Sequence, residues 1–455
     1  MKLVINSIII ILTISFNPLW AQDKPDSYSM SLQECIDFAI ENAAEIQNAQ
    51  LDVLQAEKQV KETIGIGLPQ VDGEVNWMNN FAIQTVFLPA AFFPDGAPGD
   101  PAVPVRFGVQ HTASAGINLN QLIFDGSYIV GLQAANTYQD LSRKALVQSK
   151  IATAEAVTKA FYSVLINKER LTLIIKNVNR LDTLLRETQI MYDNGFAEKI
   201  DLDRIKVNFN NLSAESKNTQ RLLALSYSLL KFQMGMDINT ELILNGSLED
   251  ISLAEIEVDA ADNFDYKNRI EFSQLLTQRE INILDLKNRR VANWPKLNGF
   301  VGLGYNAGKD SFSDIVTFDG NTWFEYGNFG LSLKVPVFSG FQRHNRIQQA
   351  KIEVAKTENN LNNLRKNIDL QIDQAQTNLN NALESLEAQQ ENMELANEIY
   401  EVTKIKYQEG VGSNFEVIEA DTDAKEAETN YYNALYDAII AKIELKKALG
   451  ILDVN

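Results

Sequence analysis

The chain has 455 residues and a formal net charge of −19 at pH 7, from 41 Lys and Arg against 60 Asp and Glu. This acidic balance argues against nucleic acid as a partner, because such binding depends on Lys and Arg that neutralise phosphates. The single Cys cannot form an internal disulfide, and the two His leave too little material for a zinc site or a His-based catalytic triad. We therefore interpret His111 and His344 as surface polar residues, and we expect no metal, no cofactor and no catalytic residue.

Residues 1–21 are expected to be a secretory signal peptide. Lys2 precedes an apolar run from Ile8 to Ile14, and the small residue Ala21 stands before polar sequence. The run is too short to cross a bilayer as a helix. No later stretch of about 20 apolar residues follows, so a role in a membrane would have to use strands.

The sequence after the signal contains an internal repeat. Matching landmarks stand 226 residues apart near the start of the two copies and 215 residues apart near their ends. The offset shrinks because the first copy carries an insertion, the Pro/Gly-rich stretch at 88–101, which is expected to form a loop. The matched landmarks are Asn42 and Asn268, Pro69 and Pro295, Gly126 and Gly340, Gly195 and Gly410, and Gly235 and Gly450.

The repeat predicts three segments after the signal peptide. The first copy occupies 22–235, an equatorial linker occupies 236–260, and the second copy with a C-terminal tail occupies 261–455. Each copy is expected to contain a helix, two strands, a long helix, a tip turn and a final helix. The predicted body is therefore elongated and mainly helical.

Long helices are predicted at about 127–194 and 342–409. In both, apolar residues recur at strict intervals of seven, which is typical of helices that wind around one another as coiled coils. In the second copy one such series is Ile347, Val354, Leu361, Ile368, Ala375 and Ala382. Shorter helices are expected at about 32–64, 201–234, 261–291 and 414–449. In each copy the two short helices together match the long helix in length.

Two stretches of alternating apolar and polar residues lie between the first helix and the long helix of each copy. One apolar face, one polar face and aromatic residues towards the ends are typical of outer-membrane strands, although an ordinary half-exposed hairpin has the same alternation. Four strands cannot close into a barrel alone, so several chains would have to pool their strands. The apolar positions are Val71, Gly73, Val75, Trp77, Ala115, Ile117, Leu119, Leu297, Val301, Leu303, Tyr305, Phe329, Leu331, Leu333 and Val335.

Proline and glycine mark the predicted borders between helices and strands. Pro69 and Pro295 stand where a helix gives way to a strand, because proline stops the propagation of a helix. Gly126 and Gly340 mark the return from strand to helix. We interpret all four residues as helix-strand turns.

With this order of elements, the chain resembles the outer membrane efflux protein family, the TolC-like exit ducts of Gram-negative envelopes. The resemblance spans about residues 30 to 450. It rests on the duplicated order of helix, strand, strand, helix and helix, and on paired sequence marks in the two copies. The marks are the turns Phe-Asp-Gly126 and Phe-Ser-Gly340 and the tips Tyr-x-x-Gly that begin at Tyr192 and Tyr407.

The resemblance implies a mixed, mainly α fold that is assembled as a homotrimer. Twelve strands, four from each chain, would form one membrane β-barrel, and a long α-helical coiled-coil barrel would continue it through the periplasm. The implied function is a passive channel-tunnel, the outer-membrane exit duct of an efflux or export system, opened by movement of its periplasmic helix tips. The implied partners are outer-membrane lipid, a periplasmic adaptor (membrane fusion) protein and an inner-membrane pump.

The resemblance also implies a gate at the tip turns of Gly195, Gly410 and Gly412. Family members carry two carboxylates six and nine positions after the second tip glycine, which here gives Glu416 and Glu419. In a trimer these would ring the periplasmic entrance, where like charges raise one another's pKa and attract cations. A solvated helix face is the alternative interpretation.

A gate lock is implied by two further residues, Tyr407 and Asp201, whose counterparts hold the closed state in the family. A family arginine that adds a second link is replaced here by Gly412, so half of that lock is missing. Tyr407 could instead simply continue the heptad packing. Asn and Gln residues at 359–392 would suit a water-filled lumen, or equally the outside of a coiled coil.

Two rival functions fit parts of the sequence. A type I protein secretion system would use an exit duct of the same architecture for an unfolded polypeptide. A periplasmic adaptor or structural coiled-coil protein would need no barrel, but the alternating aromatic strands argue against it. An enzyme is not expected, because no nucleophile, metal cluster or phosphate-binding loop is present.

Overall fold

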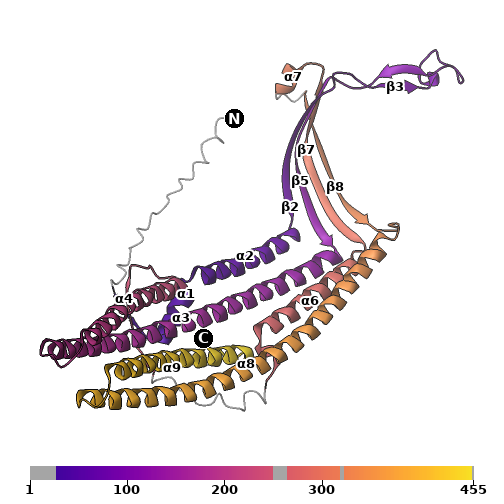
Figure 1. The fold of residues 1–455 in the computed structure, drawn as a ribbon. Coiled ribbons are helices and arrows are strands. Elements are labelled where there is room, and N and C mark those ends of the chain that lie inside the picture. Colours follow the sequence, from indigo (N-terminus) through magenta and orange to yellow (C-terminus); the bar gives the residue numbers. More distant parts are fainter. Residues whose placement is uncertain (1–26, 249–263, 318–321, 453–455) are drawn as a thin grey trace.

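The structure is a computed structural model that describes residues 27–248, 264–317 and 322–452 (Figure 1). The predicted signal peptide lies outside the described residues, as does part of the predicted linker at 236–260. In the described part of the chain, no helix combines the length and hydropathy needed to cross a membrane.

The first half of the chain runs from a short strand through helix, strands and helices. Its elements are β1 (Ser27–Met30), α1 (Leu32–Asn42), α2 (Ala44–Ile66), β2 (Gln70–Asn79), β3 (Thr85–Leu88), η1 (Ala90–Phe92), β4 (Val103–Arg106), β5 (His111–Phe124), α3 (Gly126–Asp193), α4 (Lys199–Met234) and β6 (Glu241–Leu244).

The second half presents the same order of long elements. Its elements are η3 (Tyr266–Asn268), α6 (Ile270–Val291), β7 (Lys296–Lys309), α7 (Phe312–Val316), β8 (Trp323–Lys334), α8 (Gln342–Gln408) and α9 (Asn414–Leu449). The two long helices, α3 and α8, contain 68 and 67 residues, so they begin and end within one residue of the predicted positions.

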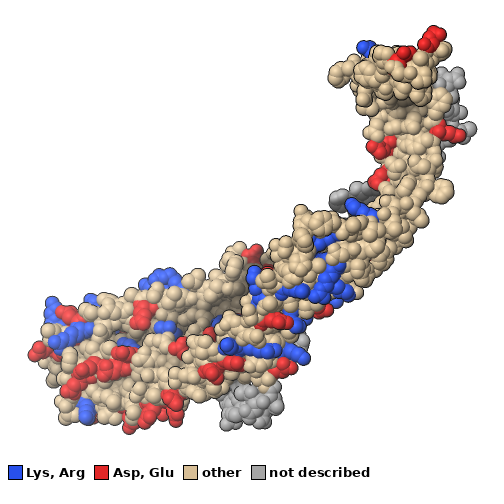
Figure 2. Space-filling model, turned by 90° about the vertical axis from the view of Figure 1, so that its right-hand side faces the viewer, with Lys and Arg blue, Asp and Glu red and all other residues tan. Residues whose placement is uncertain are grey.

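The helices lie side by side along one elongated body, and the four long strands rise together from one end of it (Figure 1). α3 packs on α2 and α4 in its own half and on α6 in the other, while α8 packs on α6 and α9. The turns that join α3 to α4 and α8 to α9 both lie at the end opposite the strands (Figure 1). On the face shown in Figure 2, acidic and basic side chains both lie over the helical part, and the arm of strands carries few charged side chains.

The first predicted helix, 32–64, is broken at Ala43. Ala43 is extended, with φ −65° and ψ 128°, and separates α1 from α2. The break lies against the end of α4, where Gly235 adopts a left-handed φ of 70° and approaches the backbone of Asn42. The second half repeats this arrangement, because Gly450 approaches Asn268 in the same way and Arg269 is extended.

Arg269 occupies the second break as a buried cation, where the first half has Ala43. Only 6% of Arg269 is exposed. It donates from Nη1 to the Ala448 carbonyl (2.9 Å), from Nη2 to Gln371 Oε1 (2.9 Å) and from Nε to Glu271 Oε2 (3.2 Å). The first bond ties the start of α6 to the last turn of α9, and the second ties it to α8. Polar contacts therefore hold the second copy at its waist, the region where the break at Arg269 meets the end of α9.

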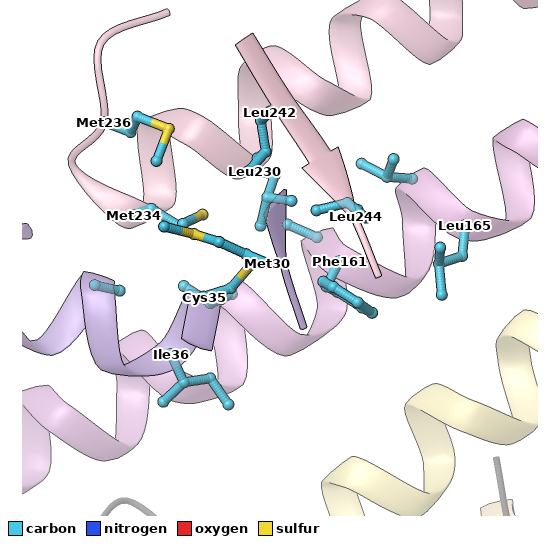
Figure 3. Close-up of a cluster of buried hydrophobic side chains, with 14 of the residues drawn as sticks. Met30, Cys35, Ile36, Phe161, Leu165, Leu230, Met234, Met236, Leu242 and Leu244 are labelled. Carbon is cyan, nitrogen blue, oxygen red and sulfur yellow. The ribbon is translucent and has the colours of Figure 1, made fainter. Parts of the chain in front are cut away.

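The corresponding waist of the first copy is apolar (Figure 3). Met30, Cys35, Phe161, Leu230 and Met234 belong to one buried cluster that joins β1, α1, α3 and α4. β1 pairs in parallel with β6 beside it, which adds Leu242 and Leu244 to the cluster. The two copies therefore share an order of elements, but the waist is stabilised by apolar packing in the first copy and by polar contacts in the second.

Cys35 is expected to be inert in the folded protein. It is completely buried, and burial followed by the nearby charge of Glu34 raises the pKa of its thiol to about 12. At pH 8 only about one thiol in 10,000 would be the reactive thiolate. Maleimide should therefore leave the native protein unlabelled and label it once after denaturation, as measured by intact mass. Labelling of the native protein within minutes would contradict the packing in Figure 3.

The long strands form one antiparallel sheet in the order β2-β5-β7-β8. Its register places the predicted apolar residues opposite one another, for example Val75 with Ala115, Ile117 with Leu303 and Val301 with Phe329. All of these side chains except Ala115 are exposed in the single chain, with Val75 at 80% and Phe329 at 86%. β2 and β8 are the two edges of the sheet, so each has one side without a partner strand in the described chain.

The opposite face of the sheet carries aromatic rings that lie over glycines. A Cβ on Gly116 or Gly304 would meet the hydroxyl of Tyr326 at 2.7 or 2.8 Å, and a Cβ on Gly330 would meet the ring of Phe300 at 2.7 Å. These rings therefore lie close to the surface of the sheet instead of standing away from it.

The outer end of the sheet differs from the prediction at two places. The insertion is more than a loop, since β3 and β4 pair as a hairpin around residues 89–102. His111 is not a surface residue, because it is only 8% exposed and lies between Trp77 (5.8 Å, stacked) and Phe312 (5.9 Å). The short α7 brings Phe312 onto the strands, a contact that the alternating pattern did not predict. His344 is exposed, as expected.

Candidate functional site

The two tip turns have the same backbone geometry. Gly195 and Gly410 are left-handed, with φ of 81° and 75°. In each turn the glycine N–H donates to a tyrosine carbonyl three residues earlier, and the next N–H donates to the carbonyl five residues earlier. This is the glycine-terminated end of a helix, which lets the chain reverse without strain.

Gly412 needs its small size for a different reason. Its φ is not left-handed, but a Cβ there would lie 3.1 Å from the Tyr407 nitrogen and 3.2 Å from Lys406. Its own N–H donates to the Lys406 carbonyl (3.1 Å). The turn is therefore closed over position 412, so a side chain there would require Lys406 and Tyr407 to shift by a few tenths of an ångström.

Glu416 and Glu419 are both exposed near the start of α9. Glu416 also forms a capping box, in which Ser413 Oγ accepts from the Glu416 N–H (3.3 Å) and Glu416 Oε2 accepts from the Ser413 N–H (3.5 Å). A carboxylate in this place satisfies a free backbone donor at the helix start. Glu416 thus has a local structural role that the sequence interpretation did not include.

Tyr407 and Asp201 are not joined to each other in the single chain. Tyr407 is half-buried and packs against the apolar cluster at the tips, while Asp201 lies 4.0 Å from Arg204. The tip hairpins are instead joined by Asn414, whose Nδ2 donates to the Asp201 carbonyl (3.2 Å). Asn414 is 4% exposed, and its Oδ1 has no hydrogen-bond partner among the residues that the structure describes.

A charged link between α3 and α9 was missed in the sequence. Arg180 donates to Asp421 Oδ1 (2.5 Å), and Lys425 forms an ion pair with the other oxygen of Asp421. Asp421 is 5% exposed. The residues of the first pair are 241 positions apart, in different copies of the repeat, so no local pattern could have joined them.

Arg180 also connects α3 to α8. Its guanidinium lies 4.0 Å from the ring centre of Tyr400, a cation–π contact with a side chain that is only 2% exposed. Burial raises the pKa of Tyr400 to about 12, although the charge of Arg180 acts in the opposite direction. Tyr400 therefore stays neutral across the physiological range and offers Arg180 a ring face, not a charge.

A second polar link lies further from the tips. Asn177 Nδ2 donates to Glu428 Oε2 (3.0 Å), and both residues are buried. Arg180, Asn177, Asp421 and Glu428 thus form two cross-copy links along the contact between α3 and α9.

The four predicted helix-strand turns occupy the expected borders. Pro69 and Pro295 directly precede β2 and β7. Gly340 is left-handed, with φ 57°, and is followed by Phe341 at φ 62°. Gly126 is instead the first residue of α3, where a Cβ would lie 3.1 Å from both Trp294 and Val291, so its small size favours close packing between the copies.

The polar row on α8 is exposed in the single chain. It comprises Asn359, Asn360, Asn362, Asn363, Gln371, Gln374, Asn378 and Asn380. Both of the interpretations made from the sequence, a lumen and an outer face, are compatible with this exposure.

Comparison with known proteins gives three results. Residues 286–451 match the model of the outer membrane efflux protein family. The outer membrane protein TolC of Vibrio cholerae is 22% identical over 351 residues, which cover 75% of this chain and 79% of TolC. Among solved structures, VceC of Vibrio cholerae superposes with a TM-score of 0.69 at 14% identity, covering 92% of this chain and 96% of VceC. The open state of the Neisseria gonorrhoeae MtrE channel gives 0.71 at 14% identity, covering 92% and 88%.

These matches confirm the resemblance predicted from the sequence. They confirm the predicted class of function, an outer-membrane efflux channel, and the predicted location in the outer membrane of a Gram-negative cell with an extension into the periplasm. The matched family is one of channels and not of enzymes.

Proposed function

We propose that this chain, which matches the outer membrane efflux protein family over residues 286–451, is one of three identical subunits of a passive exit duct. Three sheets would close into a barrel of twelve strands in outer-membrane lipid, and three sets of helices would continue it as a periplasmic tunnel. Movement of the helix tips would open the tunnel. A periplasmic adaptor protein and an inner-membrane pump would deliver the substrate and the energy.

The two unpaired edges of the sheet carry this proposal. Among the described residues, β2 and β8 each lack a neighbouring strand on one side, while the sheet exposes an apolar face that includes Val75, Leu303 and Phe329. An open edge is not tolerated in lipid, because each unpaired backbone group there costs several kcal/mol. Pairing of β8 with β2 of a second copy removes both edges at once and leaves the apolar face towards lipid.

The mass of the assembled protein tests this arrangement. Mature protein cross-linked in detergent is expected to have three times the mass of the chain and to come from the outer-membrane fraction. A mass equal to any other multiple of the chain would contradict a barrel of twelve strands. Recovery only from the soluble periplasm would instead favour the structural coiled-coil alternative.

The exported substrate distinguishes efflux from protein secretion. A duct for an unfolded polypeptide would share the fold, because substrate choice lies mostly in the pump. Deletion of this protein is expected to raise sensitivity to small toxic compounds. Loss of a secreted protein with unchanged sensitivity would favour the type I secretion alternative.

The entrance role of Glu416 and Glu419 is tested best with glutamine. We expect the double variant Glu416→Gln/Glu419→Gln to conduct with weaker selectivity for cations. In the proposed trimer it would replace six carboxylates at the narrow entrance by neutral amides. Glutamine keeps the capping box, whereas Glu416→Ala would also remove a helix cap and cost about 1 kcal/mol. The measurement is the reversal potential of the trimer in a planar bilayer under a salt gradient.

The matched control is Glu426→Gln, which removes one exposed carboxylate from the same helix further from the tip. It should leave the reversal potential unchanged. If the double variant and the control gave the same reversal potential as the parent protein, the two glutamates would be a solvated helix face and not an entrance ring.

A further inference from the structure

A pocket of about 680 Å³, the junction pocket, lies on the polar face of the sheet where the strands meet α2 and α3 (Figure 1). Its strand residues share that face, because Asn120 lies opposite Phe300 on β7, and Asn298 lies opposite Ser332 on β8. Sites for small molecules have volumes of about 300–1,000 Å³. The junction pocket is therefore large enough for such a ligand, and it lies at the end of α3 far from the tip turns.

The walls of the junction pocket are largely apolar and aromatic, with Ile66, Leu122, Tyr128 and Phe300 among them. The Tyr128 hydroxyl donates to the Ile64 carbonyl (3.4 Å), and the Phe300 ring lies close over Gly330. Both rings are thus held in place, and Phe300 remains 39% exposed. In the part of the chain that the structure describes, neither ring packs against another aromatic ring. Two aromatic side chains are therefore available to a ligand.

Three polar side chains on the strands are also available. Asn120, Asn298 and Ser332 line the junction pocket, and their side chains form no hydrogen bond with any other described residue. The two glutamines of the pocket differ, since Gln70 and Gln121 donate to main-chain carbonyls of the turn before β2. The free amides and the free hydroxyl together supply both donors and acceptors for a ligand.

The junction pocket carries no unpaired charge, although the chain as a whole is strongly acidic. Asp125 is the only residue along its described wall that is charged at neutral pH. Its carboxylate accepts from Lys296 Nζ (2.6 Å) and from the Ser127 N–H (2.7 Å), so its charge is already balanced. A charged ligand would lose hydration on entering and would find no free counter-charge. The pocket therefore favours an uncharged ligand.

Gly131 leaves the junction pocket open on the side of α3. Glycine inside a helix is destabilising relative to alanine. The local structure does not require it, because its φ is not left-handed and a Cβ there would meet nothing within 4 Å. The equivalent residue of the second copy is Asn345, which follows Gly340 by five positions as Gly131 follows Gly126. Neither the helix nor its neighbours explain the empty space, which indicates room for a ligand.

We propose that the junction pocket binds an uncharged aromatic small molecule, with its rings against Tyr128 and Phe300 and its polar group against Asn120, Asn298 and Ser332. This inference rests on the proposed function for the place of the pocket, since the polar face of the sheet would line the duct. Three such pockets would then surround the channel where the barrel meets the tunnel, and they would retain this class of compound on its way out.

Photolabelling of the purified protein with benzophenone, an uncharged aromatic ketone, tests the proposal. Under near-ultraviolet light its carbonyl oxygen takes a hydrogen atom from a nearby C–H group, and the two carbon radicals join, so the whole probe is added where it is bound. Mass spectrometry of peptides locates and quantifies the label. We expect labelling around Leu122 and Tyr128 to saturate as the probe concentration rises, whereas labelling of the apolar face at Phe329 rises in proportion.

Two comparisons identify the site and the class of ligand. Gly131→Leu fills the junction pocket and should reduce the saturable labelling by about tenfold. The matched control is Gly65→Leu on α2, where a Cβ also meets nothing within 4 Å and the residue does not line the pocket. It should leave the labelling within about twofold of the parent protein. 4-Carboxybenzophenone, which is anionic at neutral pH, should label the pocket at least about tenfold less than benzophenone.

Labelling near Leu122 that does not saturate, or equal labelling in the two glycine variants, would overturn the site. Equal labelling by the anionic probe would overturn the class of ligand. The mass of the assembled protein is measured on the same preparation. Saturable labelling of a protein that is not a trimer would retain the pocket and count against the duct.

A second variant covers the case in which Gly131→Leu does not fold. Phe300→Leu removes one aromatic ring and retains an apolar side chain, so it should raise the half-saturating concentration of benzophenone by about threefold or more. Phe329→Leu, on the opposite face of the sheet, is the control and should leave that concentration unchanged. The same half-saturating concentration in both variants would also overturn the site.

Discussion

Replacing Gly235 by alanine is expected to lower the free energy of unfolding by about 3 kcal/mol. Gly235 ends α4 with a left-handed φ of 70°, which costs an L-residue with a Cβ about 1–2 kcal/mol. The new Cβ would also lie 2.5 Å from the Asn42 carbonyl oxygen and 2.9 Å from the Cα of Ala43. Both are backbone atoms at the break between α1 and α2, so relief requires the break itself to move. Thermal and denaturant unfolding of the purified protein measure the effect.

Gly195→Ala is the matched control for this substitution. Gly195 is also left-handed, with φ 81°, but a Cβ there would meet no atom within 4 Å. It shares the backbone penalty without the contact, so we expect a loss of about 1 kcal/mol. Equal losses at the two positions would show that the approach of Gly235 to Asn42 places no constraint on the waist.

Both residues of the contact between Gly235 and Asn42 were identified in the sequence, but the contact itself was not predicted. Asn42 with Asn268, and Gly235 with Gly450, were identified as separate landmarks of the repeat. In the structure each glycine lies against the asparagine of its own copy. Repetition can show that a residue occupies equivalent places, but it cannot show which residues of one copy touch, because that depends on how the helices fold back.

Long local patterns predicted the helices well. The bounds of α3 and α8 followed from apolar residues at intervals of seven and from the glycines that end each run. The break at Ala43 was missed, since alanine is a strong helix former and the approach of Gly235 to position 43 is a contact between distant parts of the sequence.

The polar links between the two hairpins were not predicted for a related reason. Asn414, Asp421 and Glu428 stand at intervals of seven in the sequence, yet polar residues on a helix are normally solvated. Their partners Arg180 and Asn177 belong to the other copy, 241 and 251 positions away. A buried charge can be inferred only when both members of the pair are known, and the topology alone supplies that.

Alternation predicted the two faces of the sheet but not how one of them is filled. By alternation, Gly302 and Gly304 fall on the polar face, because they stand between the apolar positions Val301, Leu303 and Tyr305. The structure shows that Gly304 and Gly116 make room for Tyr326, a residue on a different strand. Which aromatic ring lies on which glycine depends on the register of β5, β7 and β8, and alternation does not determine register.

Gly304→Ala is expected to prevent most of the protein from assembling. A Cβ at this position would lie 2.5 Å from the Ala115 carbonyl oxygen, 2.8 Å from the Cα of Gly116 and 2.8 Å from the Tyr326 hydroxyl. Tyr326 could move, but the other two atoms are backbone of β5, which pairs with β7 along most of its length. Overpacking of this kind costs about 1–3 kcal/mol in each subunit.

In the proposed trimer this cost would be multiplied by assembly, because three sheets would have to reach a common curvature before their edges could pair. A displacement between β5 and β7, the central pair, moves β2 and β8 apart in every subunit. The trimer band on a mild gel should therefore fall by about tenfold or more, since three penalties act on one equilibrium.

Gly73→Ala tests whether the loss of trimer depends on the position of the glycine in the sheet or would follow any replacement of a strand glycine by alanine. Gly73 lies on β2 in the same sheet, and a Cβ there would meet nothing within 4 Å. This variant should give as much trimer as the parent protein, because alanine suits a strand at least as well as glycine. Loss of trimer in both variants would mean that the edges tolerate no change at all, whereas loss in Gly304→Ala alone would show that assembly depends on the internal spacing of β5 and β7.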